Sequence, residues 1–274
     1  MHARPNAPEG DVRNDEMTKT RPKGVYAAPA LEKAFQIIEL LADYPDGALV
    51  SEMSAKLGRS VGELFRIVVV LEQLGYLRRS TRTDRYTVAY RMLDLAFRAT
   101  PAQNLARVAL PRMQILAMET DQSCHLVAPN DGRGLVIARE ESPGTRGFAL
   151  RLGAAIDMIQ SCSGQVILAF SSPHRAERII AAAQAERETA VDLQWLSGRL
   201  ETVRVQGFDS RKSPITYGVT DISFPIFGFD GEVAGALTIP FLELIDGSQK
   251  MDLAGAQERL RTAATSISAA LGHG

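Results

Sequence analysis

The sequence lacks most of the features that mark membrane proteins, metalloproteins and cofactor enzymes. Its two cysteines, Cys124 and Cys162, are too few for a disulfide framework or a zinc site, so we expect a reducing cytoplasm. No apolar run reaches the roughly 18 residues of a membrane span, and the polar N-terminus has no signal-peptide core. Gly-x-Ser-x-Gly, Gly-x-Gly-x-x-Gly and Walker motifs are missing. We therefore expect no membrane association, no metal and no cofactor.

Charge is balanced over the whole chain but unevenly distributed along it. The 274 residues include 31 Lys and Arg against 32 Asp and Glu, which excludes a uniformly basic nucleic-acid binder. Residues 56–98 hold 9 basic and 4 acidic side chains, whereas residues 101–274 hold 16 basic and 19 acidic ones. A basic segment attached to an acidic remainder suits a small nucleic-acid-binding module joined to a domain with another role. Chance alone can also produce such a window.

Residues 25–89 have the pattern of a winged helix-turn-helix domain, which follows a tail (1–24) that we expect to be disordered and in which Met17 is an alternative start. Pro29 suits the first turn of a helix over residues 29–43. Ser51 is expected to cap a short helix that Gly58 ends, and Ser60 with Glu63 has the form of a capping box for a third helix. Two basic segments, 76–79 and 85–88, then read as a hairpin.

This arrangement predicts contacts with double-stranded DNA. The third helix would enter a major groove about 12 Å wide, with Arg66 reading bases, while the arginines of the hairpin contact phosphates. Ser60 and Glu63 suit helix capping as well as base reading. The alternative is a three-helix packing unit with a solvated hairpin. The candidate DNA-binding residues are Ser51, Arg59, Ser60, Val61, Gly62, Glu63, Phe65, Arg66, Arg78, Arg79, Arg82 and Arg85.

The remaining chain predicts a helical connector over residues 90–119 and an α+β domain over 120–274. Pro111 should kink the connector or begin a new helix. Strands are expected near 123–127, 134–139, 148–152, 217–227 and 232–241, and helices near 162–171, 174–187, 193–206 and 252–271. Helices that cover one face of an antiparallel sheet would complete this domain.

The chain resembles the IclR family of bacterial transcriptional regulators from about residue 28 to residue 272. Residues 31–41 (LEKAFQIIELL) look like the family's opening helix, and residues 71–77 (LEQLGYL) look like the end of its recognition helix. Residues 207–208, 217–219 and 229–239 (FDGEVAGALTI) look like its C-terminal elements. The resemblance implies a winged helix-turn-helix, a connecting helix and a GAF-like effector-binding domain in a homodimer or a tetramer.

The departures from the family pattern concern both functional parts. The recognition helix, residues 60–66 (SVGELFR), has fewer hydroxyls than is usual, so its operator should differ. Asp221 stands where a Cys is common, and Arg211 stands where an acidic residue is common. The usual His-Cys-Thr-Ala-x-Gly-Lys-Ala stretch is replaced by residues 159–166 (IQSCSGQV).

The resemblance implies a small organic acid as effector, held where a helix begins near Cys162. Unpaired N–H groups at a helix start suit a carboxylate. Arg211 and Asp221 would pair with each other, or Arg211 would hold an anion while Asp221 accepts hydroxyls, as in a sugar acid. Alternatively, the serines only cap the helix and Cys162 is a small buried residue. The candidate effector-binding residues are Ser161, Cys162, Ser163, Gly164, Arg211, Asp221, Ser223 and Thr238.

Two hypotheses remain from different classes. The first is a ligand-responsive DNA-binding regulator of a catabolic operon. The second is a thiol enzyme that uses Cys162 as nucleophile at a helix N-terminus, although the sequence shows no base beside it. His125 and Cys124 are adjacent on an expected strand and should therefore point to opposite faces.

Overall fold

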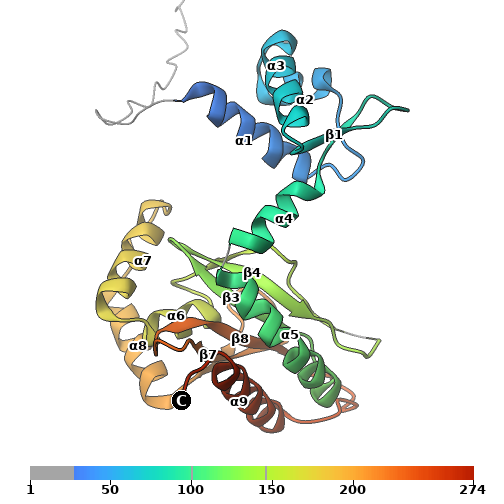
Figure 1. The fold of residues 1–274 in the computed structure, drawn as a ribbon. Helices are drawn as coiled ribbons and strands as arrows, with labels where there is room; N and C mark the ends of the chain where they lie inside the picture. The colour runs from blue at the N-terminus through green and yellow to red at the C-terminus, as the bar shows by residue number, and fades with distance from the viewer. Residues whose placement is uncertain (1–27, 100, 146) are drawn as a thin grey trace, which may run out of the picture. The chain divides into compact units, whose positions relative to one another are not determined.

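The computed structural model describes residues 28–99, 101–145 and 147–274. The tail predicted over residues 1–24 lies outside these ranges. The chain divides between Asp94 and Leu95 into two compact units, and each is described by itself. Figure 1 shows the elements of both units.

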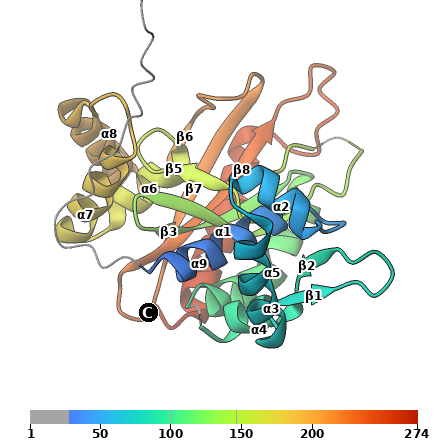
Figure 2. The same cartoon turned by 90° about the horizontal axis from the view of Figure 1, so that it is seen from above.

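The first unit is a three-helix module followed by a two-stranded antiparallel hairpin (Figures 1 and 2). Its elements are α1 (Pro29–Ala42), α2 (Val50–Leu57), α3 (Val61–Gln73), β1 (Leu77–Arg79) and β2 (Tyr86–Val88), with α4 (Tyr90–Ala99) leading out of it. Pro29 is in the first turn of α1, and Gly58 ends α2 in the left-handed region at φ +61°. These local signals confirm the predicted winged helix-turn-helix.

One apolar cluster holds this module together. Ile37 of α1, Met53 of α2 and Leu64 with Val68 of α3 are completely buried against one another. Tyr86 of β2 joins the same cluster and ties the hairpin to the helices. Because α3 buries only one of its faces here, its opposite face remains available to solvent.

The second unit is built on one six-stranded antiparallel sheet. The strands lie in the order β5-β4-β3-β8-β7-β6. They are β3 (Cys124–Asn130), β4 (Arg133–Glu140), β5 (Ala155–Asp157), β6 (Asp209–Lys212), β7 (Val219–Phe227) and β8 (Val233–Leu242). The helices are α5 (Pro101–Thr120), α6 (Cys162–Phe170), α7 (Pro173–Ala185), α8 (Leu193–Gln206) and α9 (Leu253–Ala270).

Helices cover both faces of this sheet, whereas the sequence predicted one covered face. α5 and α9 pack on one face around a cluster that includes Met113, Ile222 and Leu260. α6 packs on the other face, with α7 and α8 beyond it, around a cluster that includes Val127 and Val166. Figure 1 shows the two groups of helices on opposite sides of the strands. The chain therefore has two separate apolar layers in this unit.

One of the two outcomes predicted for Pro111 is excluded: it does not begin a new helix, because α5 continues through it while Ala109 and Met113 bury their side chains against the sheet. Two other local predictions were wrong. Residues 148–152 form no strand, and the strand that pairs with β4 is β5, a few residues later. Ser51 does not cap α2, because the helix begins at Val50 and Leu49 is in the capping position. In each case packing or a neighbouring residue outweighed the local signal.

Candidate functional site

The leading turn of α3 is exposed. Val61 and Phe65 are 49% and 50% exposed, and Gly62 and Arg66 lie on the same exposed side. A Cβ on Gly62 would meet no atom within 4 Å, so the helix surface there is open. This end of α3 therefore presents two apolar side chains and one cation to a partner.

Ser60 and Glu63 organise α3 from its N-terminus. The Ser60 hydroxyl accepts a hydrogen bond from the Glu63 N–H at 3.3 Å, as a capping residue does. The Glu63 carboxylate forms an ion pair with Lys33 of α1, which holds the pKa of Glu63 below its ordinary value. Of the two roles predicted for Ser60 and Glu63, the structure shows the capping one for Ser60 and a link to α1 for Glu63.

The hairpin carries three exposed arginines. Arg78, Arg79 and Arg82 are exposed on β1 and the turn after it, and Arg59 is exposed between α2 and α3. Arg79 is paired with Asp84 at 2.9 Å across the hairpin. Figure 2 shows the hairpin extending away from the helices of its own unit. Arg78, Arg82 and Arg59 are therefore exposed cations, and Arg79 is an exposed cation that has a carboxylate beside it.

Arg85 has a different role from the predicted phosphate contact. Its guanidinium donates to both carboxylate oxygens of Glu52 at 2.8 and 2.9 Å, and to the Gly47 carbonyl at 2.9 Å. Glu52 also accepts from the Leu49 N–H at 3.0 Å, and this bond and then Arg85 lower the pKa of Glu52. Gly47 is required because a Cβ there would lie 2.6 Å from the Tyr86 carbonyl oxygen. Arg85 therefore joins the hairpin to α2.

In the second unit, polar side chains form a row across the sheet. Asp209 on β6 lies opposite Ser223 on β7, which lies opposite Thr238 on β8, which lies opposite His125 on β3. Directly opposite residues of an antiparallel pair share a face. The residues next to the row in sequence include Cys124, Ile222 and Leu237, which belong to the cluster under α5 and α9. Because successive side chains on a strand point to opposite faces, the row itself faces α6.

The start of α6 packs closely on its own preceding loop and on the sheet. Ser161 caps the helix by accepting from the Gly164 N–H at 2.9 Å. A Cβ on Gly164 would lie 2.5 Å from the Met158 Cα, so only glycine fits. Ser163 is buried beside them. The alternative interpretation gave both serines a capping role, and the structure shows that role for Ser161.

Cys162 is buried and faces the strands. Its Sγ lies 3.5 Å from the Asp209 carbonyl oxygen and 3.7 Å from that of Asp221. Burial, and then the charges of Asp209 and Asp221, raise the pKa of the thiol well above its ordinary value. A nucleophilic cysteine requires the opposite shift. The geometry contradicts the thiol-enzyme hypothesis.

Arg211 pairs with Asp209 rather than with Asp221. Arg211 Nε lies 3.3 Å from Asp209 Oδ2, and another guanidinium nitrogen donates to the Gln160 carbonyl. Asp221 lies directly opposite Arg211 on β7. Burial is the main cause that raises the pKa of the Asp221 carboxyl. The structure thus brings Arg211, Asp221 and the start of α6 together, but in a different pairing from the one predicted.

Arg199 and Gln165 are functional candidates that the sequence did not reveal. Arg199 on α8 binds Asp209 Oδ1 at 2.8 Å and donates to Gln165 Oε1 at 3.3 Å. Gln165 in turn donates to the Ile159 carbonyl at 2.7 Å, in the loop before α6. This chain of bonds connects α8, α6 and β6. The polar strand β6 itself has no β-branched or aromatic residue that would have predicted it.

The middle and far end of the row are uncharged. The hydroxyls of Ser223 and Thr238 bond each other at 2.8 Å, and both residues are buried. His125 is 4% exposed, and its Nδ1 has no partner among the described residues. Burial lowers the pKa of His125 to about 4, so its ring is neutral at pH 7. In the sequence, the alternation of side chains along β3 was the one signal that indicated the orientation of His125.

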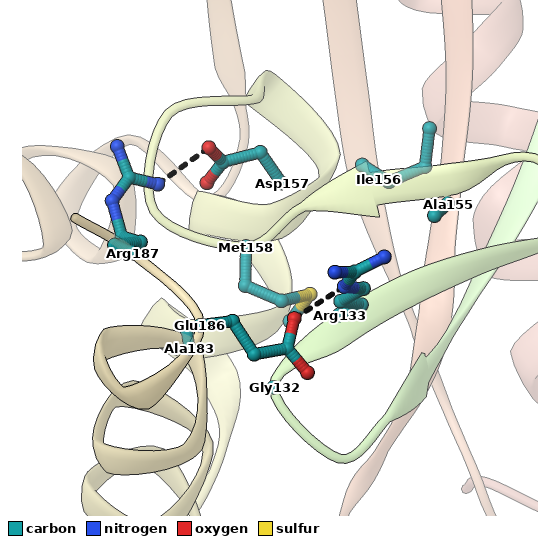
Figure 3. Close-up of a pocket in the computed structure, with 9 residues that line it drawn as sticks. All are labelled: Gly132, Arg133, Ala155, Ile156, Asp157, Met158, Ala183, Glu186 and Arg187. Atoms are coloured by element: carbon teal, nitrogen blue, oxygen red, sulfur yellow. Dashed lines mark hydrogen bonds and ion pairs between the residues drawn. The ribbon is translucent and has the colours of Figure 1, made fainter. Parts of the chain in front are cut away.

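A separate cavity of about 240 Å³ lies at the β3–β4 turn, β5 and the end of α7 (Figure 3). Arg133 pairs with Glu186, and Arg187 pairs with Asp157 at 2.6 Å. The charged groups that line the cavity therefore neutralise each other. Of the predicted effector-binding residues, none lines it. The paired charges make it a poor site for an ion.

Within residues 28–99, 101–145 and 147–274, none of the helices has both the length and the apolar character of a membrane span. Among these same residues, no group of three or more His, Cys, Asp or Glu side chains is placed to hold a metal ion.

Two family models match the chain and together span most of it. The IclR helix-turn-helix domain matches residues 30–81. The bacterial transcriptional regulator IclR C-terminal domain matches residues 97–269. The two matches coincide with the module that carries α3 and with the unit built on the six-stranded sheet.

Individual relatives agree with these matches. The HTH-type transcriptional regulator KdgR of Escherichia coli is 25% identical over 244 residues, covering 88% of this chain and 92% of that protein. The DNA-binding transcriptional repressor YiaJ of the same organism is 22% identical and covers 81% of this chain and 79% of that protein. An IclR homologue from Microbacterium hydrocarbonoxydans, solved with 4-hydroxybenzoate, has a TM-score of 0.73 at 21% identity, covering 88% of this chain and 98% of that one.

Proposed function

This chain belongs to the IclR family of bacterial transcriptional regulators, and we propose that it controls a catabolic operon in response to a small organic acid or sugar acid. It is a ligand-responsive DNA-binding regulator and not an enzyme. The operon and the acid are the proposed parts. The observation that carries the proposal is the exposed leading turn of α3 beside a hairpin with three exposed arginines.

At the DNA, α3 reads bases and the hairpin contacts phosphates. Arg66 is the base reader, because a guanidinium can bond two acceptors of a guanine edge. Val61 and Phe65 offer apolar contacts that suit thymine methyl groups, and Gly62 permits close approach to the bases. Arg78, Arg79, Arg82 and Arg59 contact phosphates. Ser51, Ser60, Glu63 and Arg85 support this surface from within the domain or at its edge.

The regulator acts as a homodimer or as a tetramer of two dimers in the cytoplasm. Two copies of α3 about 34 Å apart would meet successive major grooves of a palindromic operator. Effector binding would change that spacing through α4 and α5. Such a change requires the effector to bind the two states with different affinities.

The effector binds on the α6 side of the sheet. The start of α6 over residues 161–164 offers a positive dipole end, and Arg211 supplies a cation beside it. Asp221, Ser223 and Thr238 add acceptors and hydroxyls for a hydroxylated acid. The 4-hydroxybenzoate in the Microbacterium protein is a hydroxylated acid of this kind.

A DNA-binding titration with the region upstream of the neighbouring gene tests the proposal. Fluorescence anisotropy would measure the affinity of the full chain for this DNA without and with each acid of a panel that includes gluconate and 4-hydroxybenzoate. We expect specific binding, and at least one acid should change the affinity tenfold or more. Binding no tighter than to a scrambled duplex would refute the operator, and unchanged affinity with every acid would refute the effector class.

A further inference from the structure

We propose that His125 is a specificity-determining residue of the effector site, where its uncharged imidazole bonds a hydroxyl or carbonyl of the acid at a point remote from the carboxylate. This inference rests on the proposed function of the α6 side of the sheet. It adds one strand, β3, to the residues expected to contact the effector.

The first support is that Nδ1 of His125 has no hydrogen-bond partner among the described residues, although buried polar atoms normally have one. Its side chain is 4% exposed, and its Nδ1 is buried without a partner among the described residues. A buried polar group without a partner destabilises the folded protein. Such a cost is understandable if a bound molecule supplies the missing bond.

The second support is the position of His125 in the polar row. Its neighbour Thr238 is a predicted effector-binding residue, and the Thr238 hydroxyl is already occupied by Ser223 at 2.8 Å. On the other side, Arg139 of β4 donates to the Leu150 carbonyl at 3.2 Å and pairs with Glu141 at 2.7 Å. Both neighbours therefore have partners, whereas Nδ1 of His125 has none among the described residues.

The third support is the separation of charge along the row. Asp209, Arg199 and Arg211 are charged and gather at β6, whereas the β8 and β3 positions hold a hydroxyl and a neutral ring. Adjacent strands lie about 4.8 Å apart, so the two ends are separated by about 14 Å before the side chains reach inward. A carboxylate suits the β6 end. A hydroxyl, which both donates and accepts, suits a neutral imidazole in either tautomer.

Pairs of acids that differ by one polar group test this role. Calorimetry on the full chain would compare 4-hydroxybenzoate with benzoate, and 6-hydroxyhexanoate with hexanoate, because in both pairs the hydroxyl is remote from the carboxylate. For any pair that binds, we expect the hydroxylated acid to bind at least tenfold tighter to the natural protein. His125→Leu should abolish that preference, and His125→Gln, which keeps a donor and an acceptor, should retain most of it. An unchanged preference in His125→Leu would overturn the inference.

Thermal unfolding without any ligand provides a second test, which asks whether His125 has a structural role and does not depend on which acid binds. Since His125 lacks a partner, His125→Leu should melt at the same temperature as the natural protein or higher. Thr238→Val, one strand away, removes a hydroxyl that does have a partner and should melt several degrees lower. A comparable loss in His125→Leu would show that His125 has a structural role and would overturn the inference. If no acid binds, the acidic effector and the contact proposed for His125 both fail, whereas an acid that binds with the same preference in His125→Leu overturns this inference alone.

Discussion

Arg85 and Glu52 form a two-pronged ion pair, 2.8 and 2.9 Å long, that fixes the hairpin of the DNA-binding module to its second helix. The same carboxylate closes the start of α2 by accepting from the Leu49 N–H. One acidic side chain thus sets both the beginning of a helix and the position of the hairpin. Because the hairpin carries Arg78, Arg79 and Arg82, the pair also determines where these cations lie.

Glu52→Gln should lower the melting temperature of the DNA-binding module by a few degrees. The hydrogen bonds to Glu52 lower its pKa in the folded state below the ordinary value of 4.5. Because the pKa is lower in the folded state, the ionised Glu52 carboxylate stabilises the folded protein above pH 4.5. This stabilisation is lost as the pH falls through the pKa that Glu52 has in the folded state. Circular dichroism melts at a series of pH values should therefore show a difference between the two proteins at pH 7 that becomes smaller as the pH falls below 4.5. A difference that does not change as the carboxyl of Glu52 is protonated would contradict this account.

Arg66→Ala should weaken operator binding by about 1–3 kcal/mol, which is about fivefold to somewhat over a hundredfold, while binding to a scrambled duplex changes little. The reason is that Arg66 lies on the exposed side of α3 where base edges would be. Anisotropy titrations against both duplexes measure the ratio. Lys56→Ala, on α2, is a useful control for loss of one positive charge. Equal losses on the two duplexes would mean that Arg66 contacts only phosphate.

Arg82→Ala should weaken binding to every sequence alike. A hairpin arginine that contacts a phosphate releases one counterion, so the slope of log affinity against log salt should flatten by about 0.9. Titrations from low to moderate salt give the slope. Arg85→Ala serves as the comparison, because its charge is engaged by Glu52 and its removal should act through stability. An unchanged slope in Arg82→Ala would exclude the phosphate contact.

Cys162 should react slowly with iodoacetamide at pH 8 in the folded protein and readily once unfolded. The thiol is buried, and its pKa is raised well above its ordinary value by that burial and by Asp209 and Asp221. Mass spectrometry of the modified peptide measures the rate. Fast stoichiometric labelling of the folded protein would restore the thiol-nucleophile hypothesis.

The DNA-binding module was predictable because its signals are local. Pro29, Gly58 and Ser60 begin or end helices through their own chemistry, and the structure uses each of them in that way. The prediction for Arg85 failed because its partner, Glu52, is 33 residues away. Charge alone does not distinguish an arginine that awaits a phosphate from one that already has a carboxylate.

The effector site was less predictable for a related reason. The residues Ser161, Arg211 and Asp221 could be chosen from the family resemblance, but it is the register between β6 and β7 that places Asp221 opposite Arg211, and Arg211 pairs instead with Asp209 of its own strand. Arg199, Gln165 and Asp209 meet only after α8 has folded over the sheet. Pairing across a sheet and contacts between layers leave no mark on a short stretch of sequence.

The alternation along β3 has a consequence for how the molecule can respond to a small acid. Cys124 and His125 are joined by a single peptide bond, yet Cys124 Sγ lies 3.6 Å from the Met113 carbonyl of α5, while His125 belongs to the opposite layer. A movement of the imidazole toward a bound molecule would displace Cys124 through one peptide unit, and so its contact with α5. The displacement would then pass directly from one face of the sheet to the other, and no chain of side-chain contacts around the edge of the sheet would be needed.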